Sequence, residues 1–113
     1  MFIDNEKLKN LVRKLGSQSI LVVGDLALDE MVYGDTERIS REAPVIILQH
    51  THTKFILGGA SNAAHNVADI NDGKVSVIGV IGEDYQALDL KRAFEEANIN
   101  CSSLITDKTR KTI

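Results

Sequence analysis

The stretch that decides the fold is LGGASNAA, residues 57–64. Its two glycines, Gly58 and Gly59, close an extended apolar segment and open a helical one over residues 60–70. Because glycine has no Cβ, this pair can adopt positive φ and bring the backbone close to a ligand. The amides that follow would be the free donors of a helix N-terminus, to which Asn62 adds a side-chain amide. The run therefore predicts either a site for a hydroxyl or an oxyanion, or a plain strand-to-helix turn without a ligand.

The composition indicates one globular domain or a part of one. The 113 residues carry a net charge of -3, which provides no bulk attraction to nucleic acids or membrane surfaces. No apolar run approaches the ~20 residues of a membrane-spanning helix, and the first residues lack the basic and apolar regions of a secretion signal. Cys101 is the only cysteine, which excludes an internal disulfide and a cysteine-based zinc site. These features predict a cytoplasmic protein.

Apolar periodicity predicts alternating helices and strands over most of the chain. The predicted elements are a helix at 4–15, a strand at 19–24, a helix at 60–70, a strand at 75–81, a helix at 85–98 and a strand at 101–105. The first strand is continuously apolar and β-branched, as in a parallel sheet covered on both faces. Asn71 is expected to form a left-handed C-cap, and Asp84 an N-cap. The order of elements predicts an open, mainly parallel α/β sheet.

Several short strands interrupt this alternation. They are predicted at residues 31–35, 45–49 and 53–57, with a charged, irregular segment between the first two. Consecutive strands inserted between one strand and the next helix suggest a small separate sheet, which serves in many proteins as a lid or an oligomer interface. His50 and His52 would share one strand face at metal-ligand spacing, but without an evident third ligand they are assigned as solvated histidines rather than as a metal site.

Two carboxylates follow the first predicted strand. Asp25 comes directly after it and Asp29 four residues later, in an expected loop. Ligands of open parallel sheets bind beyond the carboxyl ends of the strands, which makes both residues candidates for a binding site. The structural alternatives are that Asp25 caps a turn and that Asp29 is merely solvated. The dinucleotide fingerprint GxGxxG, the P-loop and the GxSxG nucleophile elbow are all absent from the sequence.

Four features together resemble the N-terminal part of the ribokinase/PfkB carbohydrate kinases. They are the strand end Gly24-Asp25 with Asp29, the inserted strands, the run Gly58-Gly59-Ala60-x-Asn62-x-Ala64 and the motif Gly79-x-x-Gly82-x-Asp84. Within that family, YGDTERISREAPV at residues 33–45 is similar to the heptose kinases, which are the kinase domains of bacterial ADP-heptose synthases. The resemblance extends from residue 18 to the end. It departs at Arg41, where proline is usual, and at Asn71, where glycine is usual.

The resemblance implies a ribokinase-like fold in which residues 31–57 form a β lid that doubles as a dimer interface. It also implies an ATP- and Mg²⁺-dependent phosphotransferase that phosphorylates D-glycero-D-manno-heptose 7-phosphate at C1, in the biosynthesis of ADP-heptose and the lipopolysaccharide core. The implied substrate-binding residues are Asp29, Gly58, Gly59 and Asn62 on the sugar, Asp25 in the loop or near the metal-phosphate, and Arg38 on the 7-phosphate. A guanidinium suits bidentate phosphate contact, whereas the alternative for Arg38 is an exposed lid arginine.

The family's catalytic motif is missing from this chain. A later Gly-Ala-Gly-Asp sequence supplies the anion hole and the general base in these kinases, and neither Gly24-Asp25 nor Gly34-Asp35 matches it. A positioned base contributes typically ~10²–10⁴-fold to a rate. We therefore expect residues 1–113 to be the N-terminal part of a kinase domain, inactive alone and binding neither ATP nor Mg²⁺ without the remaining part. The alternatives are a non-catalytic sugar-phosphate-binding or assembly module and a Rossmann-type nucleotide binder.

Overall fold

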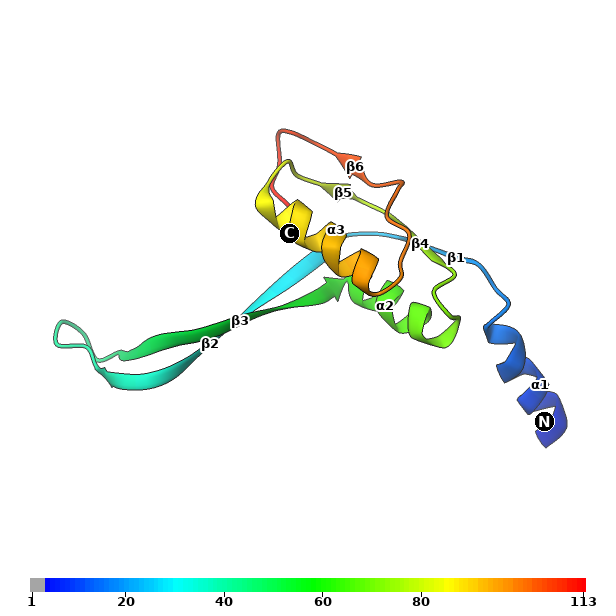
Figure 1. Ribbon diagram of the computed structural model, residues 1–113, viewed down its shortest axis with the longest axis horizontal. Coiled ribbons are helices and arrows are strands. Elements are labelled where there is room, and N and C mark those ends of the chain that lie inside the picture. Colours follow the sequence, from blue (N-terminus) through cyan, green and yellow to red (C-terminus); the bar gives the residue numbers. More distant parts are fainter. Residues whose placement is uncertain (1–3) are drawn as a thin grey trace.

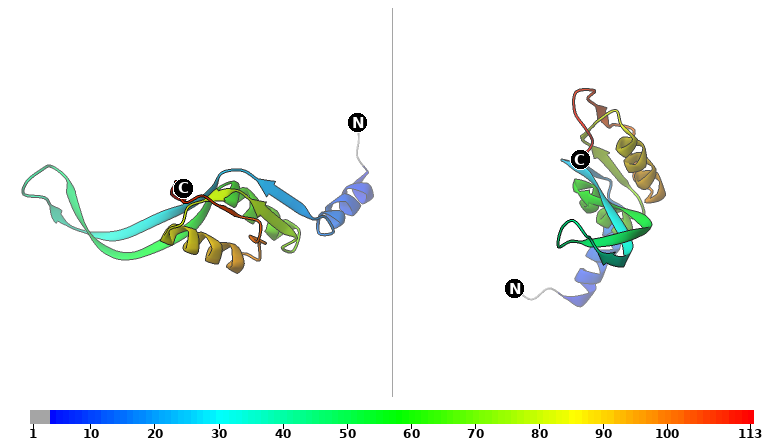
Figure 2. Two further views of the ribbon diagram at one scale, coloured as in Figure 1. Left: turned by 90° about the horizontal axis from the view of Figure 1, so that it is seen from above. Right: turned by 90° about the vertical axis from the view of Figure 1, so that its left-hand side faces the viewer.

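Two elements project in opposite directions from the central body of the chain (Figure 1). The computed structural model describes residues 4–113, with principal extents of 65 × 37 × 25 Å. A helix extends from one end and a long β hairpin from the other, and the two further views show the same separation (Figure 2). The hairpin and the helix thus lie away from the core, whereas the sheet and the other helices form it.

The described elements alternate as an α/β chain with one inserted hairpin. The helices are α1 (Asn5–Leu15), α2 (Ala60–Ile70) and α3 (Tyr85–Glu96); the strands are β1 (Ile20–Val23), β2 (Leu26–Ile39), β3 (Ile46–Gly59), β4 (Val75–Ile78), β5 (Val80–Ile81) and β6 (Ile105–Thr106). The pairs β1–β4 and β5–β6 are parallel, and a parallel bridge joins Ser76 to Asn100. Only β2 and β3 pair antiparallel in this part of the chain. These parallel pairs confirm the predicted α/β class.

The hydrophobic core lies where α2 and α3 pack on one face of β4 and on the base of the hairpin. Its buried side chains come from β2, β3, α2, β4, β5 and α3 and include Leu26, Leu57, Ala64, Val75, Val77, Ile81, Leu90 and Phe94. The buried residues of α2 are small, namely Ser61, Ala64 and Ala68, which allows this helix to pack closely on the sheet. Burying a leucine or phenylalanine stabilises the fold by about 1.5–3 kcal/mol. Leu26 and Leu57 therefore anchor the hairpin base to the core.

The second face of β1 is open. Val22 packs against the core, but the side chains of Leu21 and Val23, which point to the other face, are 54% and 69% exposed. The prediction that this strand is covered on both faces is therefore wrong for residues 4–113. A parallel sheet normally carries helices on both faces, so this one lacks half of its usual cover here.

Helix α1 forms as predicted, but none of its residues is buried in the described part of the chain. Asp4 caps it by accepting a hydrogen bond from the Glu6 amide, and Gly16 ends it. Its apolar stripe remains about half exposed at Leu8, Leu11, Val12 and Leu15. None of the helices in residues 4–113 combines the length and apolar content that crossing a membrane requires.

The inserted segment is one long hairpin and not three short strands. β2 and β3 have 14 residues each, and register shifts after Tyr33 and after Thr36 mark bulges in the ladder. The strand predictions at 45–49 and 53–57 merge into β3, which runs unbroken through the two histidines. His52 stacks on Tyr33 with a ring-centroid distance of 4.5 Å, and His50 Nε2 lies 2.9 Å from Thr53 Oγ1. Pairing across the hairpin thus overrides the irregular, charged local sequence.

Asn71 ends α2 differently from the prediction. Its φ is -114°, and the left-handed positions are the following Asp72 and Gly73. Asn71 is instead buried, and its side-chain amide donates to the carbonyls of Gln18 and Lys74 at 3.0 and 3.1 Å. The asparagine therefore ties the end of α2 to the segment that leads into β1, which a glycine could not do.

The later elements are shorter than predicted. The strand at 75–81 breaks at Gly79, where a Cβ would stand 2.7 Å from the Gly24 carbonyl oxygen and from the Leu26 side chain. The strand predicted at 101–105 is mostly a turn, and only Ile105–Thr106 pairs, with β5. Helix α3 ends at Glu96, two residues early, with Asp84 as its N-cap as predicted.

Candidate functional site

Asp29 and Gly58 lie side by side on one face of the hairpin base. Asp29 is the register partner of Ile56, and Gly58 is the partner of Ala27, which makes the two residues diagonal neighbours across the ladder. A Cβ at Gly58 would stand 2.5 Å from Oδ2 of Asp29. Only glycine at position 58 therefore lets the carboxylate lie over the β3 backbone. Asp29 belongs to β2, not to the loop that was expected, and its side chain is exposed.

Gly59 joins this pair to the start of α2. Its φ of 55° is the left-handed conformation that favours glycine, and it is the N-cap residue of the helix. The Asp25 carbonyl accepts a hydrogen bond from the Ala60 amide at 2.9 Å. The first of the helix donors predicted for a ligand is thus already engaged, and Asp25 connects the end of β1 to α2 through its backbone. The Asp25 side chain is exposed.

The first turn of α2 carries two polar side chains with opposite surroundings. Asn62 lies two residues after Ala60 and is exposed to solvent on the surface of α2. Ser61 is fully buried, and within the described residues its Oγ has no hydrogen-bond partner. Sequence reasoning did not single out Ser61, although its spacing with Ala64 and Ala68 on the buried face of α2 indicates burial.

The structure does not bring Arg38 to these residues. Arg38 pairs with Ile47 near the hairpin tip, nine residues beyond Asp29 along β2. At about 3.3 Å per residue, this places it ~30 Å from Asp29. Asp25, Asp29, Gly58, Gly59 and Asn62 therefore gather at the hairpin base, whereas Arg38 lies at the other end of the hairpin.

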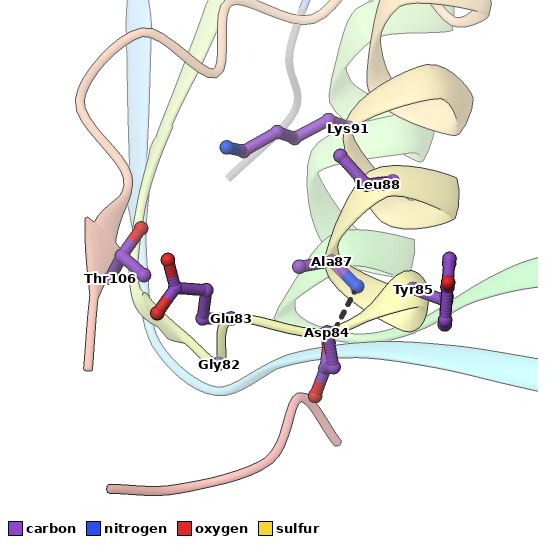
Figure 3. Close-up of a pocket in the computed structure, with 8 residues that line it drawn as sticks. All are labelled: Gly82, Glu83, Asp84, Tyr85, Ala87, Leu88, Lys91 and Thr106. Atoms are coloured by element: carbon purple, nitrogen blue, oxygen red, sulfur yellow. Dashed lines mark hydrogen bonds between the residues drawn. The ribbon is translucent and has the colours of Figure 1, made fainter. Parts of the chain in front are cut away.

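Two cavities in the described part of the chain lie elsewhere. The larger, of about 400 Å³, is lined by the loop after β5, the start of α3 and the end of β6, namely Gly82, Glu83, Asp84, Tyr85, Ala87, Leu88, Lys91 and Thr106 (Figure 3). A second, of about 330 Å³, lies between β3, α2 and α3. Neither of these two cavities includes Asp29, Gly58, Gly59 or Asn62.

Asp84 makes the predicted cap contact and two contacts with Thr112 that the sequence did not indicate. Its carboxylate accepts hydrogen bonds from the Ala87 amide at 2.8 Å, from the Thr112 amide at 2.8 Å and from the Thr112 hydroxyl at 2.7 Å. These bonds, led by the one from the Thr112 amide, lower the pKa of Asp84 despite some desolvation. The contact spans 28 residues, so no local pattern indicates it.

Two further observations describe the chemistry available in this part of the chain. Partial burial raises the pKa of the Cys101 thiol, which favours its unreactive protonated form. Within residues 4–113, no group of three or more His, Cys, Asp or Glu side chains is arranged to hold a metal ion. The candidate site residues among them offer hydrogen-bonding groups.

Comparison with solved structures supports the fold. A carbohydrate kinase from Agrobacterium tumefaciens matches with a TM-score of 0.61 at 24% identity, over 81% of this chain and 28% of that one. A fructokinase with bound ATP from Xylella fastidiosa matches with a TM-score of 0.58 at 23% identity, over 82% of this chain and 24% of that one. The ribokinase-like fold predicted from the sequence is therefore confirmed.

Sequence relatives cover most of this chain but extend far beyond it. The Bifunctional protein HldE of Granulibacter bethesdensis is 41% identical over 97 residues, which are 86% of this chain and 20% of that protein. The protein of the same name from Syntrophotalea carbinolica is 37% identical over 110 residues, which are 97% of this chain and 22% of that protein. The chain thus spans about one fifth of these relatives. The family model for the pfkB family carbohydrate kinases matches residues 17–113, and the chain belongs to that family.

Proposed function

We propose that this chain is the sugar-binding part of an ATP-dependent carbohydrate kinase whose substrate is D-glycero-D-manno-heptose 7-phosphate, phosphorylated at C1. The observation that carries the proposal is the exposed Asp29 carboxylate, which lies over Gly58 beside the first turn of α2. The segment at residues 33–45, which is similar to that of the heptose kinases, supports this particular sugar within the family. The product would serve ADP-heptose and lipopolysaccharide core biosynthesis.

The hairpin base suits a polyol because it offers acceptors and donors on one surface. The Asp29 carboxylate accepts hydrogen bonds from sugar hydroxyls, and Asn62 both donates and accepts. The Asn62 amide in the first helical turn precedes any intrahelical acceptor and can donate to the sugar. Gly59, which is exposed, lets the sugar approach the backbone, and together with Gly58 it acts as the hinge of the hairpin.

Phosphoryl transfer requires more than this chain contains. The Gly-Ala-Gly-Asp motif of the family is absent from the sequence, and the matched segment is only about one fifth of the relatives. ATP, when bound with Mg²⁺ by the remaining part of a kinase domain, supplies the phosphoryl group. The open face of β1 and the exposed stripe of α1 offer apolar surface on which that part can pack. Alone, the chain is proposed to be inactive.

The hairpin is proposed to pair two copies of the chain. It exposes apolar side chains along its length, including Met31, Val32, Ile39, Ile46, Leu48 and Phe55. An exposed two-stranded ribbon of this length is otherwise a site of uncontrolled association. In such a dimer the tip of one hairpin can reach the partner copy, so that Arg38 would contact the 7-phosphate at the site of the other copy. Within one copy it is too far away.

Calorimetric titration of the chain with heptose 7-phosphate and, separately, with ATP tests the assignment. We expect the sugar phosphate to bind and ATP not to bind. ATP binding without sugar binding would contradict the proposal.

An activity assay distinguishes a kinase part from the alternative, a non-catalytic sugar-phosphate-binding module. The chain is mixed with the part of a relative that follows the matched segment, and phosphorylation of the sugar is measured. Sugar binding without any phosphorylation in the mixture would favour the non-catalytic module.

A further inference from the structure

The Asp84 carboxylate joins two segments that lie far apart in the sequence. It caps α3 through the Ala87 amide and also accepts both hydrogen bonds that Thr112 can donate. Figure 3 shows the cap bond to Ala87 and the Asp84 side chain directed toward the chain's last residues. One carboxylate thus holds the start of a helix and the terminal segment together.

The loop before α3 also contacts Thr112, through Gly82. The Gly82 amide donates to Thr112 Oγ1 at 3.0 Å, so this hydroxyl both donates and accepts. A Cβ at Gly82 would stand 2.5 Å from the Arg110 carbonyl oxygen and 2.9 Å from the Thr112 nitrogen. The terminal segment is therefore seated tightly on this loop.

Ile113, the residue after Thr112, contacts β2, the strand that carries Asp29. The Ile113 carbonyl accepts a hydrogen bond from the Leu28 amide at 2.9 Å, and Leu28 directly precedes Asp29 in β2. On its other edge this part of β2 pairs with β3, where Leu28 is opposite Leu57. The base of β2 is thus held from both edges, by β3 and by the terminal segment that Asp84 anchors.

We infer that Asp84 is a positioning residue for the sugar site, acting through Thr112 and Ile113 on the base of β2 and so on Asp29. The inference rests on the proposed sugar-binding function. It assigns to Asp84 and Thr112 a role beyond capping α3. Asp84 contacts no substrate in this scheme, and its effect is to restrict where the Asp29 carboxylate can lie.

Replacing Thr112 separates this role from helix capping. The variant Thr112→Val removes the hydroxyl that Asp84 and Gly82 share but leaves the Asp84 bond to the Ala87 amide in place. Thr112→Ser keeps the hydroxyl. The matched control is Thr109→Val, since the Thr109 hydroxyl also donates to an aspartate, Asp107, at 2.7 Å in the same segment.

Two measurements on these variants test the inference, namely NMR-detected hydrogen exchange at the Leu28 amide and calorimetric affinity for heptose 7-phosphate. Thr112→Val loses two hydrogen bonds, and loss of each changes an equilibrium by about 2- to 10-fold. We expect this variant to speed exchange at Leu28 and to weaken sugar binding, each by at least about 2-fold. Thr112→Ser and Thr109→Val should resemble the unchanged chain in both measurements.

The outcomes distinguish the inference from the proposed function. Unchanged Leu28 exchange in Thr112→Val would overturn the connection between Asp84 and β2. Faster exchange with unchanged sugar affinity would overturn the positioning role. If the unchanged chain does not bind the sugar phosphate at all, the proposed function fails and the positioning role fails with it. Hydrogen exchange at Leu28 still decides whether Asp84 and Thr112 stabilise the base of β2.

Discussion

The carboxylate of Asp29 occupies the space that a side chain at position 58 would need, since a Cβ on Gly58 would stand 2.5 Å from Oδ2 of Asp29. Gly58 is buried and its φ does not require glycine. The glycine is therefore explained by its neighbour on β2 and not by its own backbone conformation. This relationship makes the pair a unit whose two members can be tested separately.

Gly58→Ala should displace the Asp29 carboxylate and weaken heptose 7-phosphate binding. Forcing an extra carbon into a packed position costs about 1–3 kcal/mol. Denaturant unfolding and calorimetry should therefore show a loss of stability together with a loss of sugar affinity. The matched control is Gly34→Ala, whose Cβ would stand 2.7 Å from the Gln49 carbonyl oxygen in the same hairpin but far from Asp29. Equal losses of affinity in both variants would contradict a specific effect on the carboxylate.

Asp29→Asn, placed in a complete kinase that contains this segment, should weaken use of the sugar at least tenfold. A hydrogen bond to a charged group contributes roughly 1.5–3 kcal/mol, and a neutral amide loses most of that advantage. The quantity to measure is kcat/KM for the sugar. Glu30→Gln provides the control, because this neighbouring carboxylate in β2 points to the opposite face of the hairpin. An unchanged kcat/KM in Asp29→Asn would remove Asp29 from the site.

Ser61→Ala should stabilise the chain. The Ser61 hydroxyl is fully buried without a partner in the described residues, and leaving such a group unsatisfied costs about 1–3 kcal/mol. Alanine also has the higher helix propensity. Urea unfolding should therefore show a higher midpoint with an unchanged slope. A lower midpoint would mean that the hydroxyl has a partner, such as a buried water molecule, that stabilises α2.

The sequence predicted the elements whose signals are local. The helices at 60–70 and near 85–98 have clear apolar periodicity, and the Gly58-Gly59 pair marks the strand-to-helix junction where the structure has it. These features depend on residues that are close together in the chain. Their existence and type could therefore be predicted, with errors confined to the ends, as at Glu96.

The hairpin could not be predicted at its full length, because its continuity depends on pairing between distant residues. Asp29 and Arg38 are polar residues in segments that read as loops, yet both belong to β2. Both faces of the projecting ribbon reach solvent, so its sequence shows no alternation between apolar and polar residues. The separation of Arg38 from Asp29 follows only once the ladder is known to be continuous.

The contact between Asp84 and Thr112 could not be predicted either, because it joins residues that are distant in the sequence. Asp84 was predicted as the N-cap of α3, which needs only the local sequence. Its bonds to Thr112 join residues separated by 28 positions, and the terminal segment is polar without periodicity. The sequence therefore revealed one of the two roles of this carboxylate.

The contacts of Asp84 also predict how stability depends on pH. In the folded chain, hydrogen bonds from Thr112 and Ala87 lower the pKa of Asp84 below the usual aspartate value of 3.8. The unfolded chain therefore binds a proton at this carboxylate more readily than the folded chain does. The contribution of Asp84 to stability is complete well above pH 3.8 and is lost as the pH falls from there through the folded-state pKa.

Unfolding by urea at a series of pH values below 5 should show this loss. Asp84→Asn keeps an acceptor for the Ala87 amide but cannot titrate, so its stability should fall less steeply with decreasing pH than that of the unchanged chain. Thr112→Val should also fall less steeply, because it lacks one of the donors that favour the ionised carboxylate. The Asp107 carboxylate, whose pKa is lowered by Thr109, titrates in the same direction and remains in all three chains, so it cancels in the comparison. Parallel curves for the unchanged chain and Asp84→Asn would show that Thr112 does not stabilise the ionised form.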